Sequence, residues 1–178
     1  MSVDSSKYPS LSAPIWWEPV ESVFSPGMCG DERLVSNISL IPTVGERYVM
    51  MQLEDGKWEL IGGTLEPGEA YMNGLKRELM EEIGAELADF EIVGHFSCHS
   101  RAEQPYRSHI PHPRFFRLIG TGEVKLVAAP LNPPDGEKVA RVELMDIDEA
   151  TALFRSQGRH DIAELYQFAH DWRVVQNR

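Results

Sequence analysis

The sequence predicts an α/β fold in which a mixed β-sheet lies between helices. Two observations support this class: stretches with strand character alternate with stretches of helical periodicity, and no internal repeat or low-complexity tract divides the chain. The 178 residues, 42% of them hydrophobic and 25% charged, are enough for one domain with a proper core. One folding unit is therefore expected.

The predicted strands begin after the first thirty residues. A turn at residues 43–46 separates two segments of strand character, which predicts a β-hairpin. A short strand then leads into Gly62 and Gly63 and a turn with Pro67 and Gly68. The predicted strands cover residues 35–42, 47–53, 58–61, 90–98, 114–119 and 139–144.

Three helices are predicted. The first runs from about residue 70 to residue 83. The second opens with acidic residues at 146–149, which suit a helix N-terminus, and continues to about residue 154. The third covers residues 161–175 and is amphipathic, because one face carries Ile162, Leu165, Tyr166, Ala169 and Trp172.

Residues 1–33 are interpreted as an N-terminal extension, and residues 34–178 as the main domain. The extension is rich in Ser and Pro and lacks clear periodicity. It is nevertheless too apolar for a free tail, since it contains Ile15, Trp16, Trp17, Val20, Val23 and Phe24. We expect it to pack on the domain or on a dimer partner.

The net charge of −11 argues against binding to nucleic-acid polymers or anionic membranes, because both need a basic surface. No apolar run is long enough for a membrane span and no secretion signal is evident, so a cytoplasmic location is expected. The two cysteines, Cys29 and Cys98, are interpreted as free thiols. A small anionic substrate stays compatible with this charge.

A cluster of glutamates on the first helix carries the clearest chemical signal. Glu78, Glu81 and Glu82 lie at i, i+3 and i+4, so a helix places their carboxylates on one face. Like charges at this spacing repel unless cations neutralise them, and hard oxygen ligands favour Mg²⁺ or Mn²⁺ over zinc. The spacing therefore predicts a divalent metal site, whereas a merely solvated helix face is the alternative.

The segment 62–85 resembles the box of the Nudix hydrolase family. That box is a glycine, five residues, a glutamate, seven residues, and then Arg-Glu, two residues, Glu-Glu, one residue and glycine. The matching residues are Gly63, Glu69, Arg77, Glu78, Glu81, Glu82 and Gly84. Two departures are Ala85, where the family has a bulky aliphatic residue, and Gly74 inside the helix, which costs about 1 kcal/mol relative to Ala.

The resemblance implies an α/β/α sandwich and metal-dependent hydrolysis. Water attacks phosphorus in a phosphoanhydride of a nucleoside diphosphate linked to another moiety, or of a nucleoside triphosphate. By position, the implied metal ligands are the carbonyl of Gly62 and the carboxylates of Glu78, Glu82 and Glu81. Arg77 is expected to hold the helix glutamates, and Glu69 to pair with Arg77. Family relatives are often dimers, so a homodimer is also expected.

Family members often carry one more catalytic or metal-binding acid on a loop after the sheet. The candidates here are Asp135, Glu137 and Glu123, and we favour Glu137 because its loop precedes a strand and is able to swing over the helix. A solvated turn is the alternative. The general base stays open between Glu82, Glu78 and Glu137.

The segment 95–117 carries four arginines against one glutamate in a chain of net charge −11. We predict that it folds over the site and that Arg101, Arg107 and Arg114 bind phosphates through bidentate contacts. Surface charge balance is the alternative. A zinc site from His95, Cys98, His99 and His109 is a weaker hypothesis, because the spacing matches no common template.

Five aromatic side chains are candidates for stacking on a nucleobase, although packing in the core or in a dimer is the more common role. They are Trp16, Trp17, Trp58, Tyr106 and Phe116.

Two other functions are compatible with a fold of this kind. One is a non-catalytic module that binds a nucleotide and reports it to a partner; the intact box argues against it. The other is a diphosphate isomerase with Cys98 as its thiol, which the standard box also disfavours. The box does not distinguish among dinucleotides, ADP-sugars, CoA and oxidised triphosphates as substrates.

Overall fold

A computed structural model describes residues 2–176 of the chain. Its helical segments are α1 (Pro9–Ser12), the short 3₁₀ helix η1 (Glu32–Leu34), α2 (Tyr71–Ile83), α3 (Ile147–Ser156) and α4 (His160–Gln176). Its strands are β1 (Ile15–Trp17), β2 (Val20–Pro26), β3 (Val35–Val44), β4 (Arg47–Leu53), β5 (Trp58–Glu59), β6 (Ile61–Thr64), β7 (Ala85–Leu87), β8 (Glu91–Ser100), β9 (Arg114–Leu126) and β10 (Val139–Met145).

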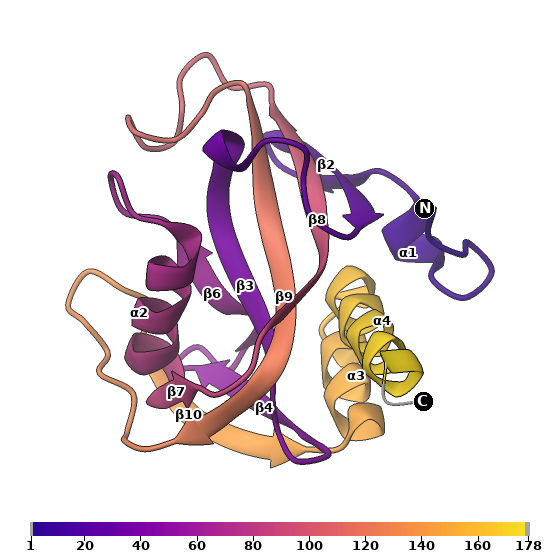
Figure 1. Ribbon diagram of the computed structural model, residues 1–178, viewed down its shortest axis with the longest axis vertical. Helices are drawn as coiled ribbons and strands as arrows, with labels where there is room; N and C mark the ends of the chain where they lie inside the picture. Colours follow the sequence, from indigo (N-terminus) through magenta and orange to yellow (C-terminus); the bar gives the residue numbers. More distant parts are fainter. Residues whose placement is uncertain (1, 177–178) are drawn as a thin grey trace.

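Three layers make up the molecule. Figure 1 shows α2 on one face of the sheet and α3 with α4 on the other. Within residues 2–176 the strands follow the order β1-β2-β8-β9-β3-β4-β10, and β5, β6 and β7 pair with β4, β3 and β9 off this path. Strands β3 and β9 run parallel while their neighbours pair antiparallel. The predicted fold class, a mixed sheet between helices, is confirmed.

Alternation along the central strands creates two separate cores. In β4, Tyr48 and Met50 belong to the core against α3 and α4, whereas Val49 and Met51 belong to the core against α2. This division follows from the period of two in a strand, which sends successive side chains to opposite faces. The sheet is therefore buried on both sides and rigid where it supports α2.

The local predictions agree with the structure at the hairpin and at the helices. Strand β4 has the predicted bounds and α2 begins one residue after the predicted start, but β3 runs to Val44, so the turn is Gly45 and Glu46 instead of residues 43–46. The acidic start of α3 is a capping box. Asp146 Oδ1 accepts a hydrogen bond from the Glu149 N–H at 2.9 Å, and the Glu149 carboxylate accepts one from the Asp146 N–H. No helix within residues 2–176 is both long and apolar enough to cross a membrane.

Two strand predictions were wrong in extent. The predicted strand at 58–61 is two strands, because β5 pairs with β4 while β6 pairs with β3. Strand β9 continues to Leu126 through Gly120 and Gly122, which have the appearance of a break in the sequence. A Cβ on Gly122 would lie 2.0 Å from the Asp89 carbonyl oxygen, so the glycine serves close backbone approach within the sheet.

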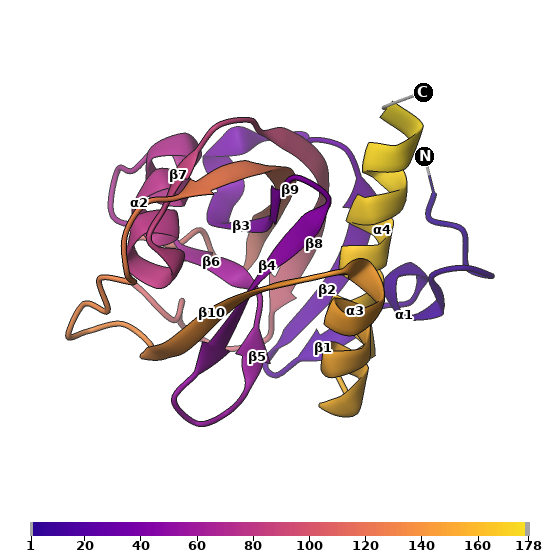
Figure 2. The same cartoon turned by 90° about the horizontal axis from the view of Figure 1, so that it is seen from below.

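The N-terminal residues add two strands that were not predicted. Strand β2 pairs with β8 from Val20 to Pro26, and β1 pairs with β2 at the edge. Figure 2 shows α1 beside α4 of the same chain. Acids of α4 hold this segment: Glu164 accepts from the Leu11 N–H at 2.9 Å, and Asp161 accepts from the indole N–H of Trp17 at 3.1 Å. A division at residue 33 stays a proposal.

Candidate active site

The floor of the site is β6, whose two glycines are required by close contacts. Gly62 has φ 130°, and a Cβ there would lie 2.2 Å from the Ile38 carbonyl oxygen of β3. A Cβ on Gly63 would lie 2.5 Å from Oε1 of Glu78. The first glycine lets the backbone turn, and the second lets the Glu78 carboxylate come close to the strand.

Helix α2 carries the glutamates and is fitted tightly at both ends. It ends at Gly84, which has φ 62° and donates its N–H to the Leu79 carbonyl. Near its start, a Cβ on Gly74 would meet the Leu65 side chain at 2.5 Å and the Glu69 carboxylate at 3.0 Å. Gly74 thus makes room for the loop between β6 and α2, which accounts for this departure from helical propensity.

Arg77 connects the loop with the helix. Its Nε and Nη2 donate to the two carboxylate oxygens of Glu69 at 2.9 and 3.0 Å, and its Nη1 donates to Glu78 at 3.0 Å and to Glu81 at 3.1 Å. Hydrogen bonds from Arg77 lower the pKa of Glu69, and those bonds raise the pKa of Arg77 in turn. A fork of this kind fixes several carboxylates at once.

Glu82 and Glu78 are carboxylates in a low-polarity environment. Glu82 accepts a 2.8 Å hydrogen bond from the Gly62 N–H. Burial raises the pKa of Glu82 well above its usual value, against the Gly62 bond, and the charges of Glu78, Glu137 and Glu81 raise it further. Burial likewise raises the pKa of Glu78, although Arg77 opposes the shift. Both side chains would ionise more easily beside a cation.

These groups border a cavity of about 360 Å³, called here the box cavity. It lies between β6, α2, the loop after β8 and the loop between β9 and β10, which runs past α2 in Figure 1. The residues that line it are Gly62, Gly63, Thr64, Glu66, Arg77, Glu78, Glu81, Glu82, Arg107, Pro133, Asp135, Gly136 and Glu137.

The loop that carries Asp135 and Glu137 is fastened at its base. The Asn132 side chain bonds the Val139 backbone twice, at 2.9 Å to the N–H and at 3.1 Å to the carbonyl. Lys138 Nζ donates to the carbonyls of Asn132 and Pro133 at 2.9 and 2.8 Å. Asn132 adopts φ 48°. Neither Asn132 nor Lys138 was predicted from the sequence, although an Asn in a Pro-rich loop is a signal for a left-handed turn.

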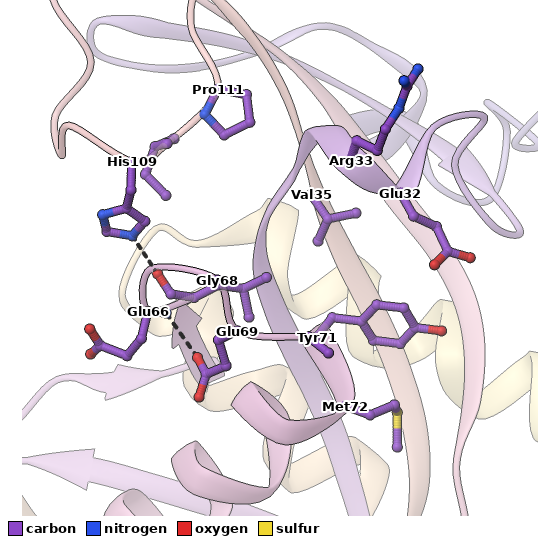
Figure 3. A pocket seen from close by; sticks show the side chains of 13 residues that line it. Glu32, Arg33, Val35, Glu66, Gly68, Glu69, Tyr71, Met72, His109 and Pro111 are labelled. Atoms are coloured by element: carbon purple, nitrogen blue, oxygen red, sulfur yellow. Dashed lines mark hydrogen bonds between the residues drawn. The ribbon is translucent and has the colours of Figure 1, made fainter.

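The loop after β8 folds onto the other side of the box cavity. The Tyr106 hydroxyl lies 2.9 Å from Oγ1 of Thr64, and His109 Nε2 lies 2.7 Å from the Leu65 carbonyl oxygen, a contact drawn in Figure 3. Arg107 lies between these two anchors and lines the cavity. Of the segment 95–117, the contacts to the box thus come from residues 106–109.

The structure corrects the set of predicted residues around this core. Arg101 pairs with Glu21 at 3.4 Å and lies over the Trp16 ring, and Arg114 lines a different hollow on the β2-β8-β9 part of the sheet. Strand pairing thus places both on a remote part of the sheet. Glu123 accepts hydrogen bonds from Thr43 and Gly45 at the hairpin, so it is not at the cavity. Of the three predicted phosphate-binding arginines, Arg107 is the one that lines the cavity.

The zinc hypothesis finds no support in the geometry. His95 Nδ1 lies 2.8 Å from the Gly27 carbonyl oxygen, and His109 Nε2 is hydrogen-bonded to the Leu65 carbonyl oxygen. The Cys98 thiol contacts the Ser22 hydroxyl. Burial raises the pKa of the Cys98 thiol, which does not favour a nucleophile. Cys29 and Cys98 are both buried free thiols, as predicted.

The five aromatic candidates for stacking on a nucleobase lie in different parts of the molecule. Trp17 and Trp58 pack in the core against α3 and α4, and Phe116 packs against the other core and the His95 ring. Trp16 is exposed beside Arg101. Tyr106, which is 52% exposed, is the candidate at the box cavity.

The donors at the box cavity fit a divalent metal in their chemistry. Glu78, Glu81 and Glu82 offer hard oxygen ligands, and burial disfavours the charged forms of Glu78 and Glu82 in the absence of a cation. In the part of the chain that the structure describes, however, no three acidic, His or Cys side chains converge on one point. Arg77 contacts carboxylate oxygens of Glu78 and Glu81.

Comparison with known proteins decides the family. A family model described as "NUDIX domain" matches residues 35–167. The chain belongs to the NUDIX domain family. This match confirms the family expected from the box. Within the NUDIX domain, the box helix is α2 and the preceding strand is β6.

The curated relatives match a shorter part of the chain than the solved structures do. The nucleoside triphosphatase NudI of Escherichia coli O1:K1 is 38% identical over 52 residues, which are 26% of this chain and 37% of that protein. Among solved structures, a mutant of the Bacillus subtilis pyrophosphohydrolase BsRppH has a TM-score of 0.56 at 17% identity over 75% of this chain and 77% of its own. A NUDIX hydrolase from Nitrosomonas europaea has a TM-score of 0.53 at 19% identity over 79% and 90%. These structures support the fold alone.

Proposed function

We propose that this NUDIX protein hydrolyses a phosphoanhydride bond in a nucleoside diphosphate linked to another moiety, or in a nucleoside triphosphate. The observation that carries the proposal is the box cavity, where Glu78, Glu81 and Glu82 face Arg107 across a polar space. Its carboxylates suit cations, its arginine suits a phosphate, and its walls exclude part of the bulk water. The NudI relative, a nucleoside triphosphatase by name, supports the same bond class.

The proposal includes Mg²⁺ or Mn²⁺ held by Glu78, Glu81, Glu82 and the Gly62 carbonyl. A bound divalent cation would neutralise charge on phosphate oxygens and lower the pKa of a water. Arg77 keeps Glu78 and Glu81 in place on α2, and Glu69 orients Arg77 from the loop. A cation held there would use oxygens of Glu78 and Glu81 that Arg77 contacts, whereas the bidentate pair of Arg77 with Glu69 involves neither of these glutamates.

The proton of the attacking water is accepted by a carboxylate at the same cavity. Glu82, with a pKa raised by burial, Glu78 and Glu137 are the candidates. A raised pKa brings a carboxylate closer to the pH at which a general base works best. Arg107 donates to the phosphate that leaves with the nucleoside or with the other moiety.

A cytoplasmic homodimer is part of the same proposal. Buried free thiols at Cys29 and Cys98 agree with a reducing compartment. The exposed side chains of Trp16 on β1, Val23 on β2 and Met28 after β2 would suit a surface between two copies.

The test is turnover of NADH, ADP-ribose, diadenosine polyphosphates, CoA and nucleoside triphosphates, with Mg²⁺, with Mn²⁺ and with a chelator. We expect cleavage that needs the metal. Glu82→Gln should lower kcat by about 10²-fold or more, because it removes a carboxylate that binds a cation or accepts a proton. Glu86→Gln, a change at an exposed residue of β7, is the matched control.

Full activity of Glu82→Gln would remove that residue from the mechanism. Absence of turnover across the panel, with nucleotide binding retained, would instead favour the non-catalytic binding module.

A further inference from the structure

The box cavity has no place to bury a nucleobase. Of the residues within 2–176 that line it, Pro133 is the only one with an apolar side chain; the others are glycines and polar or charged residues. Such walls suit phosphates and cations, but removing the face of an aromatic ring from water requires apolar contact. The ring-bearing part of a nucleotide therefore needs a second surface near the phosphates.

A second cavity lies directly on the other side of the loop between β6 and α2. Its volume is about 450 Å³, within the roughly 300–1,000 Å³ that small-molecule pockets occupy. Figure 3 shows it between η1, the start of β3, the start of α2 and residues 109–111. Its apolar lining comes from Val35, Leu65, Tyr71, Met72, Ile110 and Pro111.

The two cavities share their walls. Glu66 lines both of them. The loop after β8 also borders both, because Arg107 faces the box cavity while His109 and Ile110 face the second one. His109 is bonded to the Leu65 carbonyl at the division between them. For a molecule whose phosphates lie at Arg107, the apolar cavity is on the other side of the loop between β6 and α2.

The lining of the second cavity suits a flat, mostly apolar ring. Tyr71 projects from the first turn of α2 toward Glu32 of η1, and Met72 lies below it in Figure 3. A tyrosine ring and a thioether both make favourable contacts with an aromatic ring. Glu32 at the rim provides acceptor oxygens for exocyclic amino groups.

We infer that this second cavity binds the nucleobase of the substrate while the diphosphate occupies the box cavity. The inference rests on the proposed function for the position of the phosphates. It assigns Tyr71, Met72 and Ile110 a role in substrate selection. It also defines the substrate class as a phosphoanhydride with an amino-bearing aromatic base, in preference to one with a purely aliphatic group.

Met72→Trp is the variant that tests the inference, because Met72 is half-buried and lies outside both cores, so a larger side chain fills the cavity without disturbing them. We expect KM for the cleaved nucleotide to rise roughly tenfold with kcat retained, which is the size of effect that a small misfit in an apolar pocket produces. Asn73→Trp, at an exposed neighbour on α2 that lines neither cavity, is the control and should leave KM unchanged. Calorimetric titration with AMP in the presence of a chelator should show the same loss of affinity without any turnover.

The competing location for the base is the exposed ring of Tyr106. If Tyr106→Ala raises KM and weakens AMP binding while Met72→Trp changes neither, the base stacks at the box cavity and the inference is overturned. A variant Met72→Trp that lowers both kcat and thermal stability would also overturn it. If no compound of the panel is cleaved, the proposed hydrolase fails, but the AMP titration still decides whether the second cavity holds the base.

Discussion

At the scale of single residues, Gly63 determines where the Glu78 carboxylate lies. The position of its missing side chain is 2.5 Å from Glu78 Oε1, so the carboxylate occupies the space of a Cβ. The spacing of the box singles out this glycine in the sequence. Only the close contact in the structure shows that the Glu78 carboxylate requires it. The same holds for Gly74, where Leu65 and Glu69 fill the space beside the helix.

Gly63→Ala should therefore move Glu78 away from β6 and lower turnover by about 10²-fold, since displacement of a catalytic group by about 1 Å has effects of that order. Gly30→Ala is the matched control, because a Cβ there meets nothing within 4 Å. Steady-state kinetics and thermal melting of both variants give the answer. Equal activity of the two variants would show that the position of Glu78 is unimportant for catalysis.

At the scale of elements, hydrogen bonds fix the loop between β9 and β10 at its base. Asn132 and Lys138 close the loop, and the Asn132 N–H also donates to the Glu81 carbonyl of α2 at 3.2 Å. These bonds hold Asp135 and Glu137 at the box cavity, although both residues are exposed. Sequence patterns predicted the loop and its acid, but the bonds that hold it depend on partners across the turn.

Asn132→Gly should lower kcat by roughly 10–100-fold, the usual effect of losing a group that orients a functional side chain. Glycine adopts φ 48° without strain, so this variant removes the side-chain bonds alone. Lys138→Met should act in the same direction, with Lys125→Met on the exposed end of β9 as its control. In a Glu137→Gln background the Asn132 effect should vanish. Losses that simply multiply would contradict a role through Glu137.

At the scale of the whole molecule, the chain ends stabilise one another. Lys7 lies 2.6 Å from Asp171 of α4, and the Tyr8 hydroxyl donates to the same carboxylate. Burial opposes ionisation of Asp171, but hydrogen bonds from Lys7, Tyr8 and Gln167 together lower its pKa. A folded-state pKa below the unfolded value means that this group stabilises the fold above the unfolded pKa and loses its contribution as the pH falls through the folded value.

Asp171→Asn should therefore lower the free energy of unfolding at pH 7 by about 1 kcal/mol, a value reduced from that of a buried charged hydrogen bond because the site is partly exposed. The difference from the natural protein should shrink as the pH is lowered below the usual pKa of an aspartate. Urea unfolding at a series of pH values measures it, with the exposed Asp89→Asn as control. A difference that is constant with pH would exclude an electrostatic origin.

Local patterns were sufficient for much of this protein. The bounds of β4, the helix α2, the capping box of α3 and the apolar face of α4 depend on residues close together in the chain, and each was predictable from periodicity or turn chemistry. The box glutamates belong to the same group, because helical spacing alone places them on one face. The sequence by itself thus determined the fold class and the family.

Contacts between distant residues decided the rest. The bond from the Leu11 N–H to Glu164 joins residues 153 positions apart, so the position of α1 against α4 is not visible in a local stretch of sequence. Arg101, Arg107 and Arg114 have the same charge in the sequence, and only the pairing of β8 with β9 and the anchors of the loop between them separate Arg107 from the other two. Tertiary structure selects among chemically equal residues because it fixes distances, and both binding and catalysis depend on distance.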